Sequence, residues 1–123
     1  MLFNNKNRKE CYVLDLDDVQ RNLVCDALLE SYNSFLQDGM QYTAADLNNL
    51  RSNILISRGE KNIVTLWERN AICNVIYRQY EAATKQGETD AAALWAVTYN
   101  HVLLSSTERE YRRTCRQGQR EAR

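Results

Sequence analysis

The sequence predicts an all-α protein in which two tandem helical hairpins form a four-helix bundle, with a short fifth helix at the C-terminus. Three observations favour this fold. The chain of 123 residues has no proline and four glycines, so long helices run uninterrupted while the usual turn residues of β hairpins are scarce. Apolar residues recur at helical spacing along most of the chain. The third observation is an internal repeat.

The repeat relates two segments that lie 48 residues apart. Residues 21–57 and 69–105 align without a gap and share nine identical residues, more than unrelated segments would share by chance. The identical pairs are Arg21/Arg69, Asn22/Asn70, Cys25/Cys73, Tyr32/Tyr80, Gly39/Gly87, Ala44/Ala92, Ala45/Ala93, Leu55/Leu103 and Ser57/Ser105. The repeat predicts two hairpins that superpose in the same order and are related by a rough two-fold axis.

Length and composition predict one domain over residues 1–123, with hairpins at about 17–58 and 62–105 and a basic C-terminal segment at 107–123. Hydrophobic residues make up 44% of the chain and charged residues 26%, as in ordinary globular domains. No stretch approaches the roughly 18 apolar residues that a membrane span requires, and no signal-peptide pattern opens the chain. Four cysteines without a disulfide framework therefore predict a cytoplasmic protein with reduced thiols.

The first helix is predicted over about 17–38, where Asp15 or Asp17 caps its N-terminus and Gly39 follows its end. The second helix is predicted over about 43–58, with its first threonine as the cap. Before the first hairpin, Cys11–Leu14 has the composition of a strand. This segment is either a strand or an extended lead-in that packs across the bundle.

The third helix is predicted over about 62–86. Its apolar residues, among them Trp67 and Ile76, occupy most of its circumference, which predicts that it is the most buried helix. The fourth helix is predicted over about 89–105. A capping-box pattern at Thr107–Glu110 then starts the fifth helix, unless the fourth helix runs on through it, and the chain is expected to fray from Gly118 onward.

The sequence offers little for catalysis or for metal binding. The four cysteines and the single histidine, His101, lack the close spacing of zinc ligands and of a nucleophile with its base. There is also no glycine-rich phosphate-binding loop. We therefore expect no catalytic residue, no metal and no cofactor. The repeat contains two Arg/Cys pairs, Arg21/Cys25 and Arg69/Cys73. Either the arginines flank an anion pocket or, as we favour, their guanidinium groups pair with nearby acids while the cysteines are small buried hydrophobic residues.

Two polar faces carry the candidate binding residues. The first predicted helix places six polar residues within roughly 80° of its circumference, Asp26 and Glu30 among them: Asp15, Asn22, Asp26, Glu30, Asn33 and Gln37. The C-terminal segment places Arg109, Arg112, Arg113 and Arg116 within about 100°, and the glutamates lie off that face. Arginine rather than lysine suits bidentate binding of carboxylate or phosphate.

These faces allow several interpretations. Both are solvated, or one docks on the other within the chain, or they bind a partner. Net charge is zero over the whole chain, but residues 11–60 carry −5 and residues 101–123 carry +3. Such asymmetry bears on partners, which are a protein or, through the arginines, a nucleic acid.

The first hairpin resembles a group of small helical-hairpin proteins encoded in phages and integrative mobile elements of Gram-positive bacteria. The residues that carry the resemblance are Arg21-Asn22 with Ala27-Leu28, the turn Gly39-Met40-Gln41-Tyr42-Thr43, and Asp46-Leu47 with Leu50. It covers about 12–56 and loosely 66–105, although the second copy lacks the Tyr-Thr turn. No site residues transfer from this group. The resemblance implies an accessory protein of a mobile element that acts on host or phage machinery.

From these observations we expect a non-catalytic helical protein-interaction module that modulates or inhibits another protein. The alternative is a nucleic-acid-binding accessory protein that uses the C-terminal arginines. An enzyme ranks third.

Overall fold

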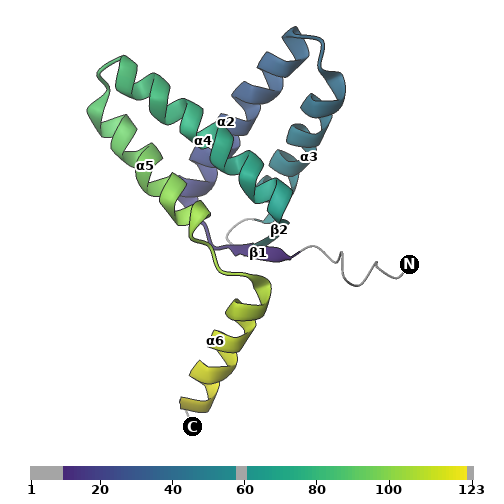
Figure 1. The fold of residues 1–123 in the computed structure, drawn as a ribbon, viewed down its shortest axis with the longest axis vertical. Helices are drawn as coiled ribbons and strands as arrows, with labels where there is room; N and C mark the ends of the chain where they lie inside the picture. The colour runs from purple at the N-terminus through teal and green to yellow at the C-terminus, as the bar shows by residue number, and fades with distance from the viewer. Residues whose placement is uncertain (1–9, 58–60, 122–123) are drawn as a thin grey trace.

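The computed structural model describes residues 10–57 and 61–121 and is mostly helical, with a small two-stranded sheet at one end (Figure 1). This confirms the prediction of a mainly helical protein. In chain order the elements are β1 (Cys11–Leu14), α2 (Asp18–Gln37), α3 (Gln41–Ser57), β2 (Asn62–Thr65), α4 (Leu66–Lys85), α5 (Thr89–Leu103) and α6 (Glu108–Glu121).

The sheet is a single antiparallel pair, in which Cys11 of β1 lies opposite Thr65 of β2 and Leu14 lies opposite Asn62. Cys11–Leu14 is therefore a strand and not only an extended lead-in. The prediction of a helix from residue 62 is wrong for its first four residues. Ile63, Val64 and Thr65 are β-branched and suit a pleated strand, and they pair with a segment that lies far away in the sequence.

Capping boxes start both long helices. The Asp17 side chain accepts a hydrogen bond from the Gln20 backbone N–H at 2.7 Å, and the Gln20 side chain accepts from the Asp17 N–H at 3.1 Å. Thr65 and Glu68 make the same reciprocal pair at the start of α4, at 3.1 and 2.8 Å. Each box satisfies two N–H groups that the helix itself leaves unpaired. Helices α2 and α4 therefore begin directly after their caps. Each of them has 20 residues.

Glycines close the same two helices. Gly39 and Gly87 have φ angles of 76° and 73°, in the left-handed region that favours glycine. The next helices then begin at Gln41 and Thr89. The predicted start of α3 at Thr43 is therefore two residues late, within the usual uncertainty of helix ends. Its predicted end at residue 58 lies outside the described residues.

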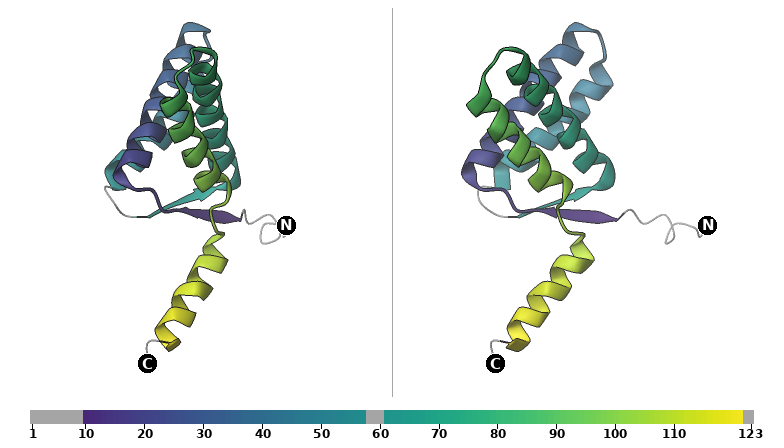
Figure 2. Two further views of the ribbon diagram at one scale, coloured as in Figure 1. Left: turned by 90° about the vertical axis from the view of Figure 1, so that its left-hand side faces the viewer. Right: turned by 60° about the vertical axis from the view of Figure 1, so that its left-hand side comes forward.

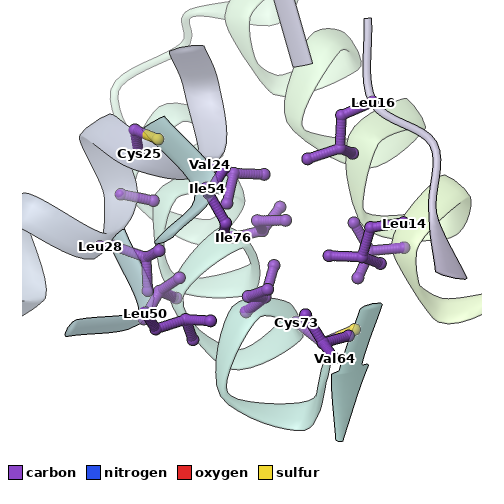
Figure 3. Packing of buried hydrophobic residues seen from close by; sticks show 14 of the residues in the cluster. Leu14, Leu16, Val24, Cys25, Leu28, Leu50, Ile54, Val64, Cys73 and Ile76 are labelled. Atoms are coloured by element: carbon purple, nitrogen blue, oxygen red, sulfur yellow. The ribbon is translucent and has the colours of Figure 1, made fainter. Parts of the chain in front are cut away.

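The core is one cluster of apolar residues to which both strands and helices α2 to α5 contribute (Figure 3). Helix α2 packs on α3, α4 packs on α5, and α2 also packs on α4. The fully buried large aliphatic residues in this cluster are Leu14, Val24, Leu28, Ile54, Ile72, Ile76 and Val102. The contact between α2 and α4 thus joins the two hairpins.

The prediction that the third helix is the most buried is wrong. Helix α4 has five buried residues and α2 has six. Trp67, which we expected in the core, is 49% exposed, whereas Ile76 is 0% exposed. These two residues are nine positions apart, and at about 100° per residue they lie on opposite sides of the helix.

The C-terminal part of the chain is a separate helix. Helix α5 ends at Leu103 and α6 begins at Glu108, so the fourth helix does not run on. The Ser106 carbonyl accepts a hydrogen bond from the Val13 N–H at 2.9 Å, and Thr107 forms a β-bridge with Tyr12. The linker is thereby fixed to the free edge of β1. Helix α6 continues through Gly118 to Glu121, so the chain does not leave the helix at Gly118, and residues 122–123 lie outside the described residues.

Among the described residues, no helix is both long and apolar enough to span a membrane.

We predict that Ile76→Ala lowers the free energy of unfolding by about 2–5 kcal/mol, because it leaves a cavity in the core. Trp67→Ala is the matched control, and its cost should be clearly smaller because half of the indole is already in water. Urea denaturation of both variants measures the two values. A cost below about 1 kcal/mol for Ile76→Ala would place α4 outside the core.

Candidate functional site

The candidate site is built on α6, whose N-terminus is fixed by a third capping box. The Thr107 hydroxyl oxygen accepts from the Glu110 N–H at 3.1 Å, and the Glu110 carboxylate accepts from the Thr107 N–H at 3.0 Å and from its hydroxyl at 2.9 Å. These hydrogen bonds, the backbone one first, hold the pKa of Glu110 below its ordinary value of 4.5. The carboxylate form therefore stabilises the first turn of α6.

Helix α6 projects away from the body of the protein (Figures 1 and 2). Its principal contact is with β1, while the four helices of the hairpins lie on the other side of the sheet. Lys61 stands over the Tyr111 ring at 5.6 Å from its centroid and adds one further contact near the start of the helix. Residues 112–118 of α6 are all exposed.

We define the arginine face of α6 as Arg109, Arg112, Arg113 and Arg116, all of which are exposed. Arg112 pairs with Glu108 at 2.9 Å, yet its side chain remains 69% exposed. Arg113 lies close enough to Glu110 to help lower the pKa of that carboxyl. In the part of the chain that the structure describes, Arg109 and Arg116 have no ion-pair partner. The arginine face is therefore available to an acidic ligand.

The arginine face also forms one wall of an open groove of about 470 Å³. Glu108, Arg109, Arg112 and Arg116 line the groove on the α6 side, and Glu10 and Cys11 line it at the start of β1. The groove is open and polar, which suits a charged segment of a partner better than a small apolar ligand.

The two acidic candidate binding residues lie apart from the arginines. Asp26 and Glu30 are exposed in the middle of α2, and α2 lies on the other side of the sheet from α6 (Figure 1). The Glu30 carboxylate accepts a hydrogen bond from the Gln79 amide at 2.7 Å. Of the interpretations that the sequence left open, docking of one face on the other within a single chain is therefore not what the structure has. The linker explains why, because its attachment to β1 directs α6 away from α2.

The repeated Arg/Cys pairs have structural surroundings. Arg21 is 6% exposed, pairs with Asp18 at 2.9 Å and donates to the Leu16 carbonyl at 3.0 Å. Arg69 donates to the Leu103 carbonyl at 3.3 Å and lies over the Tyr12 ring at 4.3 Å.

The thiols of Cys25 and Cys73 are buried, and burial raises the pKa of each. Both thiols therefore stay protonated near neutral pH and are poor nucleophiles and metal ligands. His101 Nε2 lies 2.6 Å from the Asp15 carbonyl oxygen. A carbonyl only accepts, so Nε2 carries the proton in this contact. Across residues 10–57 and 61–121, no group of three metal-binding side chains is found.

One surface escaped the sequence interpretation. Leu94 and Val97 on α5 and Leu104, which follows its end, are 51%, 61% and 78% exposed. Leu94 and Val97 share one side of the helix, and the apolar pattern alone does not tell which side meets α4. Val97 and Leu104 of this surface line an open groove together with Val13, His101 and Tyr111.

No protein-family model, curated protein or solved structure matches this chain. Its fold and site therefore define it by physical class: a mostly helical protein with a two-stranded sheet and a projecting C-terminal helix that carries an arginine face.

We predict that the N-terminus of α6 loses helicity in acid. The folded pKa of Glu110 is depressed, so the stabilisation is complete above the ordinary value of 4.5 and is lost as pH falls through the folded value. Backbone NMR chemical shifts of residues 108–111 report it during an acid titration. Glu110→Gln, which keeps an acceptor but does not titrate, should change less. If Glu110→Gln and the parent change equally, another carboxylate is responsible.

Proposed function

We propose that this chain is a non-catalytic protein-interaction module that binds an acidic surface of a protein partner through the arginine face of α6. One observation carries the proposal: the arginine face projects from the body and forms no ion pair with Asp26 or Glu30 of α2. Like charges one turn apart cost a few tenths of a kcal/mol per pair. Grouping four arginines on one side of α6 therefore has a small cost, which an acidic partner would offset.

The chemistry of the face supports a carboxylate-bearing ligand. Guanidinium groups bind carboxylates in a bidentate, geometrically specific way. Three of the four arginines line the groove beside β1, so an acidic segment lying there would contact several of them at once. Their long stems also offer apolar area to a partner. An exposed ion pair alone contributes little, so several must act together.

The second candidate function is binding of nucleic acid. The observation that favours it is the projection of α6, because a helix that stands clear of its domain is able to follow a phosphate backbone or enter a groove. Two features favour a protein instead. The net charge of the whole chain is zero, and Glu108 and Glu110 are interleaved with the arginines in the first turns of α6.

The proposal is of a non-catalytic protein, and the surroundings of two cysteines and the histidine support it. Cys25 and Cys73 are buried with raised pKa values, and His101 is engaged with a backbone carbonyl. Among the residues that the structure describes, these groups form no activated nucleophile. The resemblance of residues 12–56 to mobile-element proteins supports a role as a cytoplasmic accessory protein that modulates or inhibits a host or phage protein.

We also propose that the two hairpins are copies of one unit that together form a four-helix bundle. Helices α2 and α4 begin 48 residues apart, and so do α3 and α5. Hydrogen bonds also recur at this offset. The Ser57 hydroxyl donates to the Ile54 carbonyl at 2.8 Å, and the Ser105 hydroxyl donates to the Val102 carbonyl at 2.7 Å. Superposition of residues 17–57 on 65–105 tests this part of the proposal.

We predict that Arg112→Glu/Arg116→Glu abolishes capture of the partner and leaves thermal stability about unchanged. The affinity-tagged chain is used to isolate partners from an extract of the native host, and the identified partner is then purified and titrated directly. Arg78→Glu/Lys85→Glu is the matched control, since it makes the same charge change on exposed residues of α4.

Two outcomes would contradict the proposal. Loss of capture after nuclease treatment, with affinity that falls steeply between roughly 50 and 200 mM salt, would establish nucleic acid as the ligand. Equal partner binding by the double variant and its control would remove the arginine face from the interaction. A fall in the melting temperature of the double variant alone would indicate that the arginines stabilise the fold.

A further inference from the structure

The acidic face of α2 has the right form to receive the arginine face. We define the acidic face of α2 as Asn22, Asp26, Glu30 and Asn33, which are exposed, follow one another three or four residues apart and therefore share one side of the helix. These positions extend over about 17 Å of α2, whereas residues 109–116 cover about 10 Å of α6. The arginine face thus fits within the length of the acidic face.

The acidic face also lacks cationic partners of its own. Arg51, on the neighbouring helix α3, donates to the Cys25 carbonyl at 3.2 Å. Arg78 of α4 lies over the Phe35 ring, 5.9 Å from its centroid. Among the described residues, neither Asp26 nor Glu30 forms an ion pair. Asp26 and Glu30 on one face and Arg109 and Arg116 on the other are therefore without an ion-pair partner among the described residues.

A single chain cannot bring these faces together. The linker before α6 is held on β1 by the Val13–Ser106 hydrogen bond and the Tyr12–Thr107 bridge. From this attachment α6 runs away from the hairpins, while α2, the helix that carries Asp26 and Glu30, lies on the opposite side of the sheet (Figures 1 and 2). The arginine face of α6 can therefore contact the acidic face of α2 only if the two faces belong to different molecules.

We infer that the acidic partner of α6 is a second copy of this chain, whose α2 receives the arginine face through Asp26 and Glu30. This inference rests on the proposed function and names its partner. Because the two faces are different surfaces, two chains either exchange their α6 helices reciprocally or associate head to tail. Val19, which is 57% exposed on the same side of α2, adds apolar area to the contact.

The association is weak and sensitive to salt. Exposed ion pairs contribute little individually and are screened at high ionic strength, and association itself has a large entropic cost. Self-association is therefore expected at high micromolar to millimolar protein concentration in low salt, and it is reversed by added salt.

The test is sedimentation equilibrium of the full-length, nuclease-treated protein as a function of concentration and salt. Arg109→Glu/Arg112→Glu/Arg113→Glu/Arg116→Glu makes both faces acidic, and Asp26→Lys/Glu30→Lys makes both basic, so each variant alone should be monomeric. An equimolar mixture of the two variants should associate again, because each face then meets one of opposite charge. The chain that carries all six changes should also self-associate. Circular dichroism of every variant establishes that it is folded.

Failure of this inference is distinguishable from failure of the proposed function. A parent protein that is monomeric at millimolar concentration in low salt overturns the second copy as partner, but leaves capture of another protein by α6 intact. Self-association that both charge variants retain also overturns it, and points to the apolar surface of α5. Association that requires added nucleic acid overturns it as well. If association is lost in each variant and recovered in their mixture, the loss is due to the charges on these faces and not to loss of structure.

Discussion

The contact between α2 and α4 is the interaction on which the rest of the structure depends. Each hairpin has one apolar side and cannot bury it alone, so Val24 and Leu28 of α2 share a core with Ile72 and Ile76 of α4. This packing brings the segments that precede the two helices together, and they form the β1–β2 pair. The free edge of β1 then receives residues 106 and 107, which sets the direction of α6.

Binding of a ligand to the arginine face would also stabilise α6. A helix of 14 residues is marginal in water without tertiary packing, and α6 has one capping box and one i,i+4 ion pair, Arg112–Glu108, to stabilise it. Its four exposed arginines repel one another. An acidic surface that binds them both relieves the repulsion and stabilises the helix. Binding and helix stability are thus coupled in the same segment.

The local parts of the fold were predictable and the non-local parts were not. Asp17, Gly39 and Gly87 act through neighbouring residues, so the ends of α2 and the turns were read correctly. Strand β2 depends on a partner about 50 residues away, and a helical pattern was assigned in its place. The prediction that Trp67 is buried is wrong for a similar reason, because periodicity shows which residues share a side of a helix but not which side is covered by its neighbours. The arginine face was found from spacing alone, while its separation from Asp26 and Glu30 required the linker geometry.

The central claim is that the arginine face of a single chain stays clear of the acidic face of its own α2. The most direct measurement is the interspin distance between labels on Cys115 and a cysteine placed at position 30, with the other three cysteines replaced and excess unlabelled protein added so that only intramolecular pairs are seen. Cys115 is exposed on α6 and reports its position. A long, well-separated distance is predicted. A distance near the roughly 8–10 Å of packed helices would contradict the account.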